Sequence, residues 1–244
     1  MRYLVKISYD GSKFYGFQRQ NDKNSVQSEI EKHLSTYFNQ KILIKGAGRT
    51  DRGVHAKGQH FHFDYDNSID LLKLKKYLNH NLIYIKVKKI KSVSDDFHSR
   101  FSVIKKHYMY KISFNKKDYN SDYLLYSKRL NINEMKKTSK CFIGVHNFHN
   151  FVSGERNNYE CIIYKIRFVR HFNKLTIHFY GKSFYRYMVR NMVGALIDVG
   201  KGRAKIEDIQ SLLSSPKTDK MLSTAPAKGL TLVNIYYKMC KNSK

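Results

Sequence analysis

The sequence is poor in the residues that mark secreted, disulfide-bonded or membrane-spanning proteins. Its 244 residues include three cysteines, two prolines and no tryptophan. Cys141, Cys161 and Cys240 are odd in number and far apart, so they form neither a disulfide framework nor a Cys-x-x-Cys zinc motif. The longest stretch without Asp, Glu, Lys or Arg is the 14 residues from Cys141 to Gly154, too few to cross a bilayer. We therefore expect a protein of the reducing cytoplasm, with no membrane span and no apolar signal segment at its start.

Acidic residues are also scarce relative to basic ones. The chain has 46 Lys and Arg against 19 Asp and Glu, a formal net charge of +27. Basic residues in such excess repel one another unless a bound polyanion neutralises them. We therefore expect a nucleic-acid partner first and an anionic membrane second. Only 12 of the 46 are Arg, so most of the excess should attract phosphate rather than read bases, although a Lys-rich genome would contribute too. Hydrophobic residues make up 41% of the chain, which is enough to build folded cores.

The apolar periodicity changes repeatedly between that of strands and that of helices. In the first half it predicts strands at 3–9, 42–44, 60–65 and 83–90, a helix capped by Asn24 that runs to Phe38, and a helix at 70–79. In the second half it predicts strands at 107–114, 161–169, 175–180 and 230–237, and helices at 134–142, 184–199 and 206–213. Polar and aromatic residues alternate in 60–65, so we expect that strand to be half-buried. The order indicates an α+β fold of two α/β halves with largely antiparallel sheets, divided into domains 1–103 and 104–244.

A glycine-rich loop from Gly46 to Gln59 contains the first candidate for chemistry. It is not a phosphate-binding loop, because Lys-Ser/Thr is missing after its second glycine, and it lacks the third glycine of a dinucleotide fingerprint. Asp51 lies in this loop between Arg49 and Arg52, whose charges should keep its carboxylate ionised. An ionised carboxylate is a candidate nucleophile or base, and a salt-bridged turn aspartate fits the same pattern.

Histidines and aromatic residues are weaker indications of a functional site. His60 and His62 share a strand face, but no third ligand has obvious spacing, and His55, His98, His146 and His149 are scattered, so we predict no metal site. Tyr108, Tyr110 and the aromatic segment 184–187 could stack on RNA bases or fill a core.

Six segments spread over the chain carry a family resemblance. They are Tyr9-Asp-Gly-Ser-Lys-Phe-Tyr-Gly-Phe-Gln-Arg-Gln20, Ser25-Val26-Gln27, Gly48-Arg-Thr-Asp-Arg-Gly-Val-His-Ala56, Asp96-Phe-His-Ser-Arg-Phe-Ser102 with the following Tyr108-x-Tyr110, Met188-Val-Arg-Asn-Met-Val-Gly194 and Thr224-Ala-Pro-Ala-Lys-Gly-Leu230. Together, and in this order, they resemble the TruA family of tRNA pseudouridine synthases.

The resemblance implies a fold, a reaction and roles for four residues. It implies two α/β halves that flank a positively charged cleft, a homodimer without cofactor or metal, and isomerisation of uridines 38, 39 and 40 in the tRNA anticodon arm. Asp51 matches the catalytic aspartate, and Arg49 an arginine that extrudes and holds the target nucleotide. Tyr108 matches a tyrosine that packs on the target base, and Arg190 a basic residue that pairs with the aspartate.

The reaction needs only one carboxylate, and the sequence does not choose between its two routes. Asp51 could add to C1′ of the nucleotide, or it could remove the 2′ proton to give a glycal. Three positions depart from the family pattern: Phe17 replaces a common Trp, His107 a common Arg, and Arg52 a small residue; the segment 116–123 is also short. These departures affect the expected RNA affinity and the choice of target position.

Two other functions fit parts of the sequence. A non-catalytic RNA-binding protein of ribosomal or RNA-chaperone type would account for the charge and the many tyrosines. A metal-dependent nuclease could use Asp51 with nearby histidines, although the sequence has no acidic cluster of the kind such sites use.

Overall fold

The computed structural model describes residues 1–21, 23–214 and 223–238, which form two compact units. The first comprises Met1–Lys105 together with the described part of Leu232–Lys244, and the second comprises Lys106–Thr231. The predicted α+β class with mostly antiparallel strands is confirmed. The last strand, which the sequence analysis placed in the second half, contributes most of its length to the first unit, where it is hydrogen-bonded beside β3.

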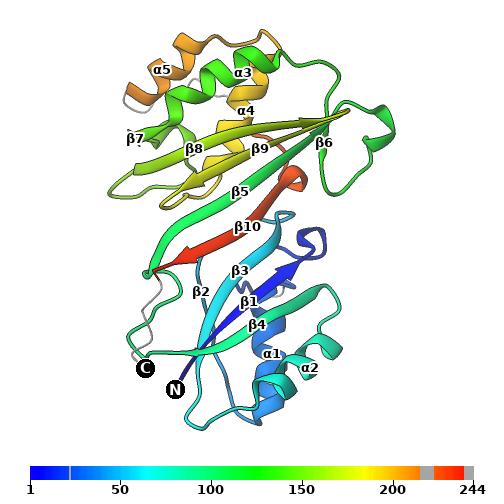
Figure 1. Ribbon diagram of the computed structural model, residues 1–244, viewed down its shortest axis with the longest axis vertical. Helices are drawn as coiled ribbons and strands as arrows, with labels where there is room; N and C mark the ends of the chain where they lie inside the picture. Colours follow the sequence, from blue (N-terminus) through cyan, green and yellow to red (C-terminus); the bar gives the residue numbers. More distant parts are fainter. Residues whose placement is uncertain (22, 215–222, 239–244) are drawn as a thin grey trace. The chain divides into compact units, whose positions relative to one another are not determined.

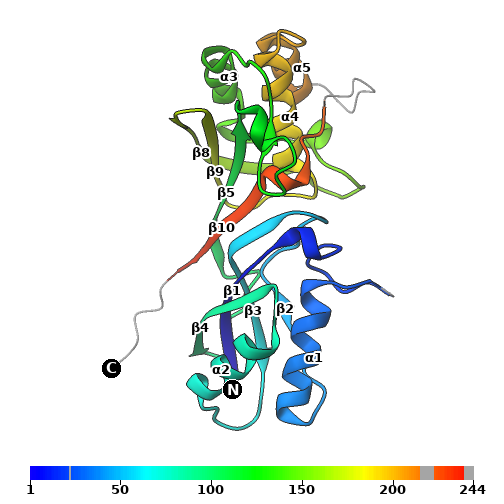
Figure 2. The same ribbon diagram turned by 90° about the vertical axis from the view of Figure 1, so that its right-hand side faces the viewer.

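The first unit is a sheet with strand order β4-β1-β3-β10, and β2 pairs with β3 (Figure 1). Two helices, α1 and α2, lie side by side against this sheet (Figure 2). The elements are β1 Arg2–Tyr9, the 3-10 turn η1 Gly11–Lys13, α1 Val26–Phe38, β2 Lys45–Gly46, β3 His55–Asp64, α2 Leu71–Asn81, β4 Ile85–Val93 and β10 Leu230–Tyr237.

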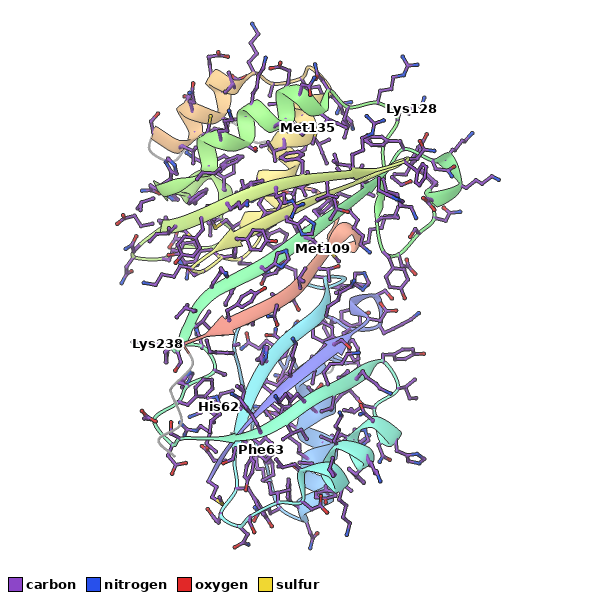
Figure 3. The ribbon with its side chains drawn as sticks, in the orientation of Figure 1. His62, Phe63, Met109, Lys128, Met135 and Lys238 are labelled. Carbon is purple, nitrogen blue, oxygen red and sulfur yellow. The ribbon has the colours of Figure 1, made fainter. Side chains whose placement is uncertain are left out.

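Three details of the first unit correct the sequence analysis. Ser25, not Asn24, caps α1, because its hydroxyl accepts a 3.1 Å hydrogen bond from the Ser28 N–H and the Ser28 hydroxyl accepts one from the Ser25 N–H. The short strand before the glycine-rich loop is 45–46 rather than 42–44. Strand β3 begins earlier, at His55, and is buried on both faces rather than one. His62 and Phe63, labelled in Figure 3, are adjacent in the strand, so their side chains point to opposite faces, and both are buried.

The second unit is a sheet with strand order β5-β9-β8-β7, to which β6 adds in parallel beside β5. Three α-helices pack on it, with α4 in contact with α3 (Figure 1). The elements are β5 Val103–Ser113, η2 Lys116–Asp118, β6 Leu125–Tyr126, α3 Ile132–Ser139, η3 Lys140–Phe142, β7 Gly144–Asn147, η4 His149–Phe151, β8 Glu160–His171, β9 Lys174–Gly181, α4 Met188–Gly200, α5 Ile206–Ser214 and η5 Ala227–Gly229.

Helix α4 forms the centre of the second unit, and eleven of its thirteen residues are buried. It begins at Met188, four residues later than predicted, because Tyr187 adopts a left-handed conformation with φ 64° that a helix cannot continue through. Among the described residues, no helix combines the length and apolar character needed to cross a membrane.

Candidate active site

Asp51 lies in a tight turn between β2 and β3 of the first unit. Its carbonyl accepts a 3.1 Å hydrogen bond from the Val54 N–H, and Gly53 has φ 79°, the value that a type II turn requires at its third residue. Because only glycine adopts this value without strain, the turn explains why Gly53 follows the Asp51-Arg52 pair. Asp51 itself is half-buried, and Arg52 is exposed at the tip.

The opening segment of the chain fixes the backbone that precedes Asp51. The Phe17 N–H donates a 3.1 Å hydrogen bond to the Thr50 carbonyl, and the Tyr9 hydroxyl lies 2.8 Å from the Thr50 hydroxyl in a buried contact. Burial raises the pKa of Tyr9 to about 12, so its hydroxyl keeps its proton at neutral pH. Gly16, with φ 102°, approaches so closely that a Cβ there would lie 2.9 Å from the Thr50 oxygen. Residues 9–17 therefore act as a support for the Asp51 turn.

The backbone on the other side of Asp51 is held in the same way. The Gly11 N–H donates a 3.0 Å hydrogen bond to Nδ1 of His55, which is buried at the start of β3. A Cβ on Gly11 would lie 2.1 Å from the Val54 oxygen, so only glycine permits this approach. Further along β3, the Gln59 side chain donates a 2.8 Å hydrogen bond to the Gly48 carbonyl. The loop that carries Asp51 is thus bonded at both ends.

The two arginines beside Asp51 have different surroundings. The Arg52 guanidinium stacks on the ring of Tyr15, 4.3 Å from its centroid, in a cation–π contact. Arg49 is exposed and forms no hydrogen bond or ion pair with any residue that the structure describes. The donors of its guanidinium are therefore not used by any residue that the structure describes.

Tyr108 lies on β5 of the second unit, opposite Phe179 of β9. It is 7% exposed, and the edge of its ring meets Phe184 at a centroid distance of 5.2 Å and an interplanar angle of 76°. Its neighbour Tyr110 is fully buried and its hydroxyl donates a 2.8 Å hydrogen bond to the Pro226 carbonyl. Tyr110 is therefore a core residue rather than a surface for base stacking.

Arg190 lies in the first turn of α4 and is oriented by its neighbours in the second unit. Its Nε donates a 2.8 Å hydrogen bond to the Ala225 carbonyl, and its own carbonyl accepts one of 3.1 Å from the Ala225 N–H. The guanidinium also lies 4.6 Å from the ring centroid of Tyr187. The left-handed backbone of Tyr187 places this ring at the start of α4, beside the cation.

The segment that holds Arg190 is itself tied to α4. Asp198 accepts hydrogen bonds of 3.0 Å from both the N–H and the hydroxyl of Ser223, and the Thr224 hydroxyl donates one of 2.7 Å to Asn191. The helix comes so close to this segment that a Cβ on Gly194 would lie 1.4 Å from the Ser223 oxygen. The motifs at 188–194 and 224–230 thus form one supporting structure.

The four predicted site residues divide between the units. Asp51 and Arg49 share one loop of the first unit, and Tyr108 and Arg190 belong to the second. The pairing of Arg190 with Asp51 stays a prediction. Within the described ranges, no cluster of three His, Cys, Asp or Glu side chains could hold a metal ion. The supporting roles of Tyr9, Asn191 and Asp198 were not predicted from the sequence. Tyr9 and Asn191 lie within family-like motifs, and that was their only signal.

Comparison with known proteins identifies the family. A family model described as tRNA pseudouridine synthase matches residues 6–102 and 139–238. The chain is 40% identical to tRNA pseudouridine synthase A of Listeria monocytogenes serotype 4a, covering 97% of this chain and 99% of that protein. It is 37% identical to proteins of the same name from Mycoplasmoides gallisepticum (96% of this chain, 90% of that one) and Thermosipho melanesiensis (97% and 99%).

The chain therefore belongs to the tRNA pseudouridine synthase family. Among solved structures, a crystal structure of a Cbf5-Nop10-Gar1 complex is similar over 80% of this chain and 54% of that one, with 9% identity and a TM-score of 0.36. At that score the likeness adds nothing to the assignment.

Proposed function

We propose that the protein isomerises uridines 38, 39 and 40 of the tRNA anticodon arm to pseudouridine, with Asp51 as the catalytic residue. One observation carries the proposal: a half-buried aspartate lies on a turn whose flanking residues, Thr50 and His55, are both hydrogen-bonded by the opening segment of the chain. A carboxylate fixed in this way can meet a reacting carbon without reorganising, which is the condition for efficient nucleophilic or base catalysis.

The reaction breaks the C1′–N1 bond of uridine and forms a C1′–C5 bond. N1 gains a proton, and C5 loses one once the base has turned. Asp51 either adds to C1′ as the nucleophile or takes the 2′ proton as the base, and in both routes it is released at the end. The target must first leave the base stack at a cost of about a few kcal/mol, which contacts to the RNA backbone offset.

The other three residues act on the extruded nucleotide. The exposed guanidinium of Arg49 contacts the RNA backbone beside the target and helps to hold the nucleotide out of the stack. The ring of Tyr108, supported at its edge by Phe184, packs on the base while it turns. Arg190, held by Ala225 and Tyr187, pairs with Asp51 and keeps the carboxylate charged and directed.

The family resemblance extends the proposal to the assembly and the compartment. The protein acts as a homodimer in the cytoplasm, and its net charge of +27 attracts the tRNA backbone. The relatives' name, tRNA pseudouridine synthase A, supports tRNA as the substrate.

The decisive experiment compares the wild type with Asp51→Asn on unmodified tRNA in EDTA. The substitution keeps the size of the side chain and removes its charge, so pseudouridine formation should cease while tRNA affinity stays near that of the wild type. Asp66→Asn, the same chemical change at an exposed loop residue, is the matched control and should retain full turnover.

The same assay separates the alternatives. A non-catalytic RNA-binding protein would bind tRNA and leave every uridine unchanged. A metal-dependent nuclease would shorten the RNA in the presence of Mg²⁺, and EDTA would abolish the cleavage. Pseudouridine formation by Asp51→Asn would remove this aspartate from the mechanism.

A further inference from the structure

A basic concavity lies in the second unit, at the C-terminal end of α4, where the loop after β6 meets the start of α3. Its volume is about 880 Å³ and it is open to solvent. Four cations line it, and no carboxylate does among the described residues: Lys128, Arg129, Lys201 and Arg203. A 2.8 Å hydrogen bond from the Asn131 N–H to the Gly200 carbonyl joins its two walls.

Helix stabilisation accounts for only two of these cations. Lys201 and Arg203 follow the C-terminus of α4, where positive charge offsets the negative end of the helix dipole. Lys128 and Arg129, however, closely precede Asn131, the cap of α3, and so lie near the positive end of that helix; Lys128 is labelled in Figure 3. Cations at a helix N-terminus are unfavourable for stability, and an anion bound there would reverse the penalty.

The positive surface continues beyond this concavity along α3. A second concavity, of about 550 Å³, shares Asn131 with the first and is lined by Lys136, Lys137 and Lys140. Its one carboxylate, Glu134, is already in a 2.8 Å ion pair with Lys137. From Asn131 to Lys140 the helical rise is about 14 Å, so the cations form an extended track rather than a pocket for one small anion.

We propose that this track binds the phosphodiester backbone of the substrate tRNA at a point away from the target nucleotide. The inference rests on the proposed function, since it assumes that tRNA is the substrate. An extended polyanion is the ligand that several separate cations can contact together, whereas a free phosphate needs only one or two. Tyr126, which also lines the first concavity, offers a ring face to a ribose or an unpaired base.

The concavity and Arg190 lie at opposite ends of the same helix, α4. Arg190 lies in the first turn of α4 and Gly200 at its end, so ten residues, or about 15 Å of helix, separate them. A bound tRNA is much longer than this distance. The track would thus add affinity for the tRNA without taking part in the chemical step.

The test uses the full-length chain with four neutral substitutions, K128Q/R129Q/K201Q/R203Q, all at exposed positions. The matched control, K32Q/K41Q/K73Q/K76Q, removes the same charge from exposed positions of the first unit. Binding of unmodified tRNA is measured from roughly 50 to 300 mM salt, and pseudouridine formation is measured at saturating tRNA.

For about 5 to 8 phosphate contacts, the wild type should show a log–log salt slope near −4 to −7. Loss of three or four contacts should flatten this slope by about 2 to 4, because each contact contributes roughly 0.7 to 0.9. We expect the dissociation constant to rise tenfold or more near 0.1 M salt, with kcat unchanged. The double variant K128Q/R129Q should show about half of the flattening, and the control should stay within twofold of the wild type.

Four results would overturn the proposal. The first two are unchanged tRNA affinity in the quadruple variant and equal weakening of tRNA binding in the control. The third is a quadruple variant that no longer binds inorganic phosphate, tested at 10 mM, but still binds tRNA. The fourth is a quadruple variant that no longer binds anionic phosphatidylglycerol vesicles but still binds tRNA. Failure of the proposed function is a separate outcome, since it would appear as wild-type protein that binds tRNA and makes no pseudouridine.

Discussion

The strand that leaves the Asp51 turn contains two histidines that the fold keeps neutral, and this predicts a specific sensitivity to acid. His62 is fully buried, and its Nδ1 accepts a 3.2 Å hydrogen bond from the Ser99 N–H. The Ser99 hydroxyl donates to the Lys45 carbonyl at 2.6 Å and lies 2.9 Å from the same Nδ1, so its proton is directed away from the ring. Protonation of Nδ1 would end the hydrogen bond from the Ser99 N–H, because two N–H donors would then face each other. Burial, reinforced by the charge of Arg2, lowers the pKa of His62 to about 4.

The size of the effect follows from linkage. In the unfolded chain His62 titrates at 6.5, so between pH 6.5 and 4 the unfolded state binds a proton that the folded state does not. The free energy of unfolding therefore falls as the pH falls through this window. A difference of about 2.5 pKa units corresponds to about 3 kcal/mol below pH 4 and about 2 kcal/mol at pH 5. His60, whose pKa burial and Lys6 also lower to about 4, should add a similar amount.

The assay is denaturant unfolding at pH 7.5, 6 and 5, followed by far-ultraviolet circular dichroism, for the wild type and His62→Gln. The variant keeps an oxygen that can accept the Ser99 N–H but does not titrate, so its loss of stability between pH 7.5 and 5 should be smaller by about 2 kcal/mol. His80→Gln, at an exposed position of α2, should lose as much as the wild type. If His62→Gln has the pH dependence of the wild type, or if the ring titrates near 6.5 by NMR, the reasoning from burial is refuted.

Three further predictions concern the site and its supports. Tyr108→Phe should keep most tRNA affinity, whereas Tyr108→Leu should lose about 1–3 kcal/mol in filter binding, the usual value of a stacked base; equal mild effects would leave the ring a purely structural role. Gly194→Ala should lower the free energy of unfolding by about 1–3 kcal/mol and also lower kcat. The added methyl would displace Ser223 and with it the nearby Ala225 carbonyl, which orients Arg190, so an unchanged kcat in a folded variant would contradict this. Ser25→Ala should lower the unfolding free energy by about 1 kcal/mol in denaturant titrations, through loss of the α1 cap, and an unchanged midpoint would contradict the capping argument.

Sequence periodicity predicted the helices and strands that have one apolar and one polar face. It did not predict burial where a segment distant in the sequence covers the polar face. Strand β10 and helix α5 lie within a residue of the predicted bounds, because their apolar positions repeat regularly. Strand β3 appeared half-buried, since nothing local shows that its polar face is covered. Tyr237 covers it from the end of the chain, with its ring 5.4 Å from His60. The short strands β6 and β7 were missed because two to four residues carry no period.

The sequence indicated some residues of the candidate site but not the contacts that hold them. The glycine-rich loop and the two flanking arginines made Asp51 a candidate, because nearby positive charge favours an ionised carboxylate, and a salt-bridged turn aspartate fitted the same pattern. Its supports were not predictable, since the contacts between Phe17 and Thr50 and between Gly11 and His55 join positions more than thirty residues apart. The basic concavity had no sequence signal beyond overall charge, because its walls come from residues 126–131 and 200–203.

These supports explain why the family-like motifs contain many residues that touch no substrate in the proposed mechanism. In the first unit, the opening motif contributes backbone bonds and two close glycine approaches that fix the Asp51 turn. In the second, the closing loop supplies the carbonyl that orients Arg190, and Gly194 allows that loop to reach the helix. The Asp51 turn and Arg190 are thus each held by a segment far away in the sequence. A substitution in either supporting segment should therefore reduce turnover while leaving Asp51 and Arg190 chemically intact, as errors of about 1 Å in position are costly in catalysis.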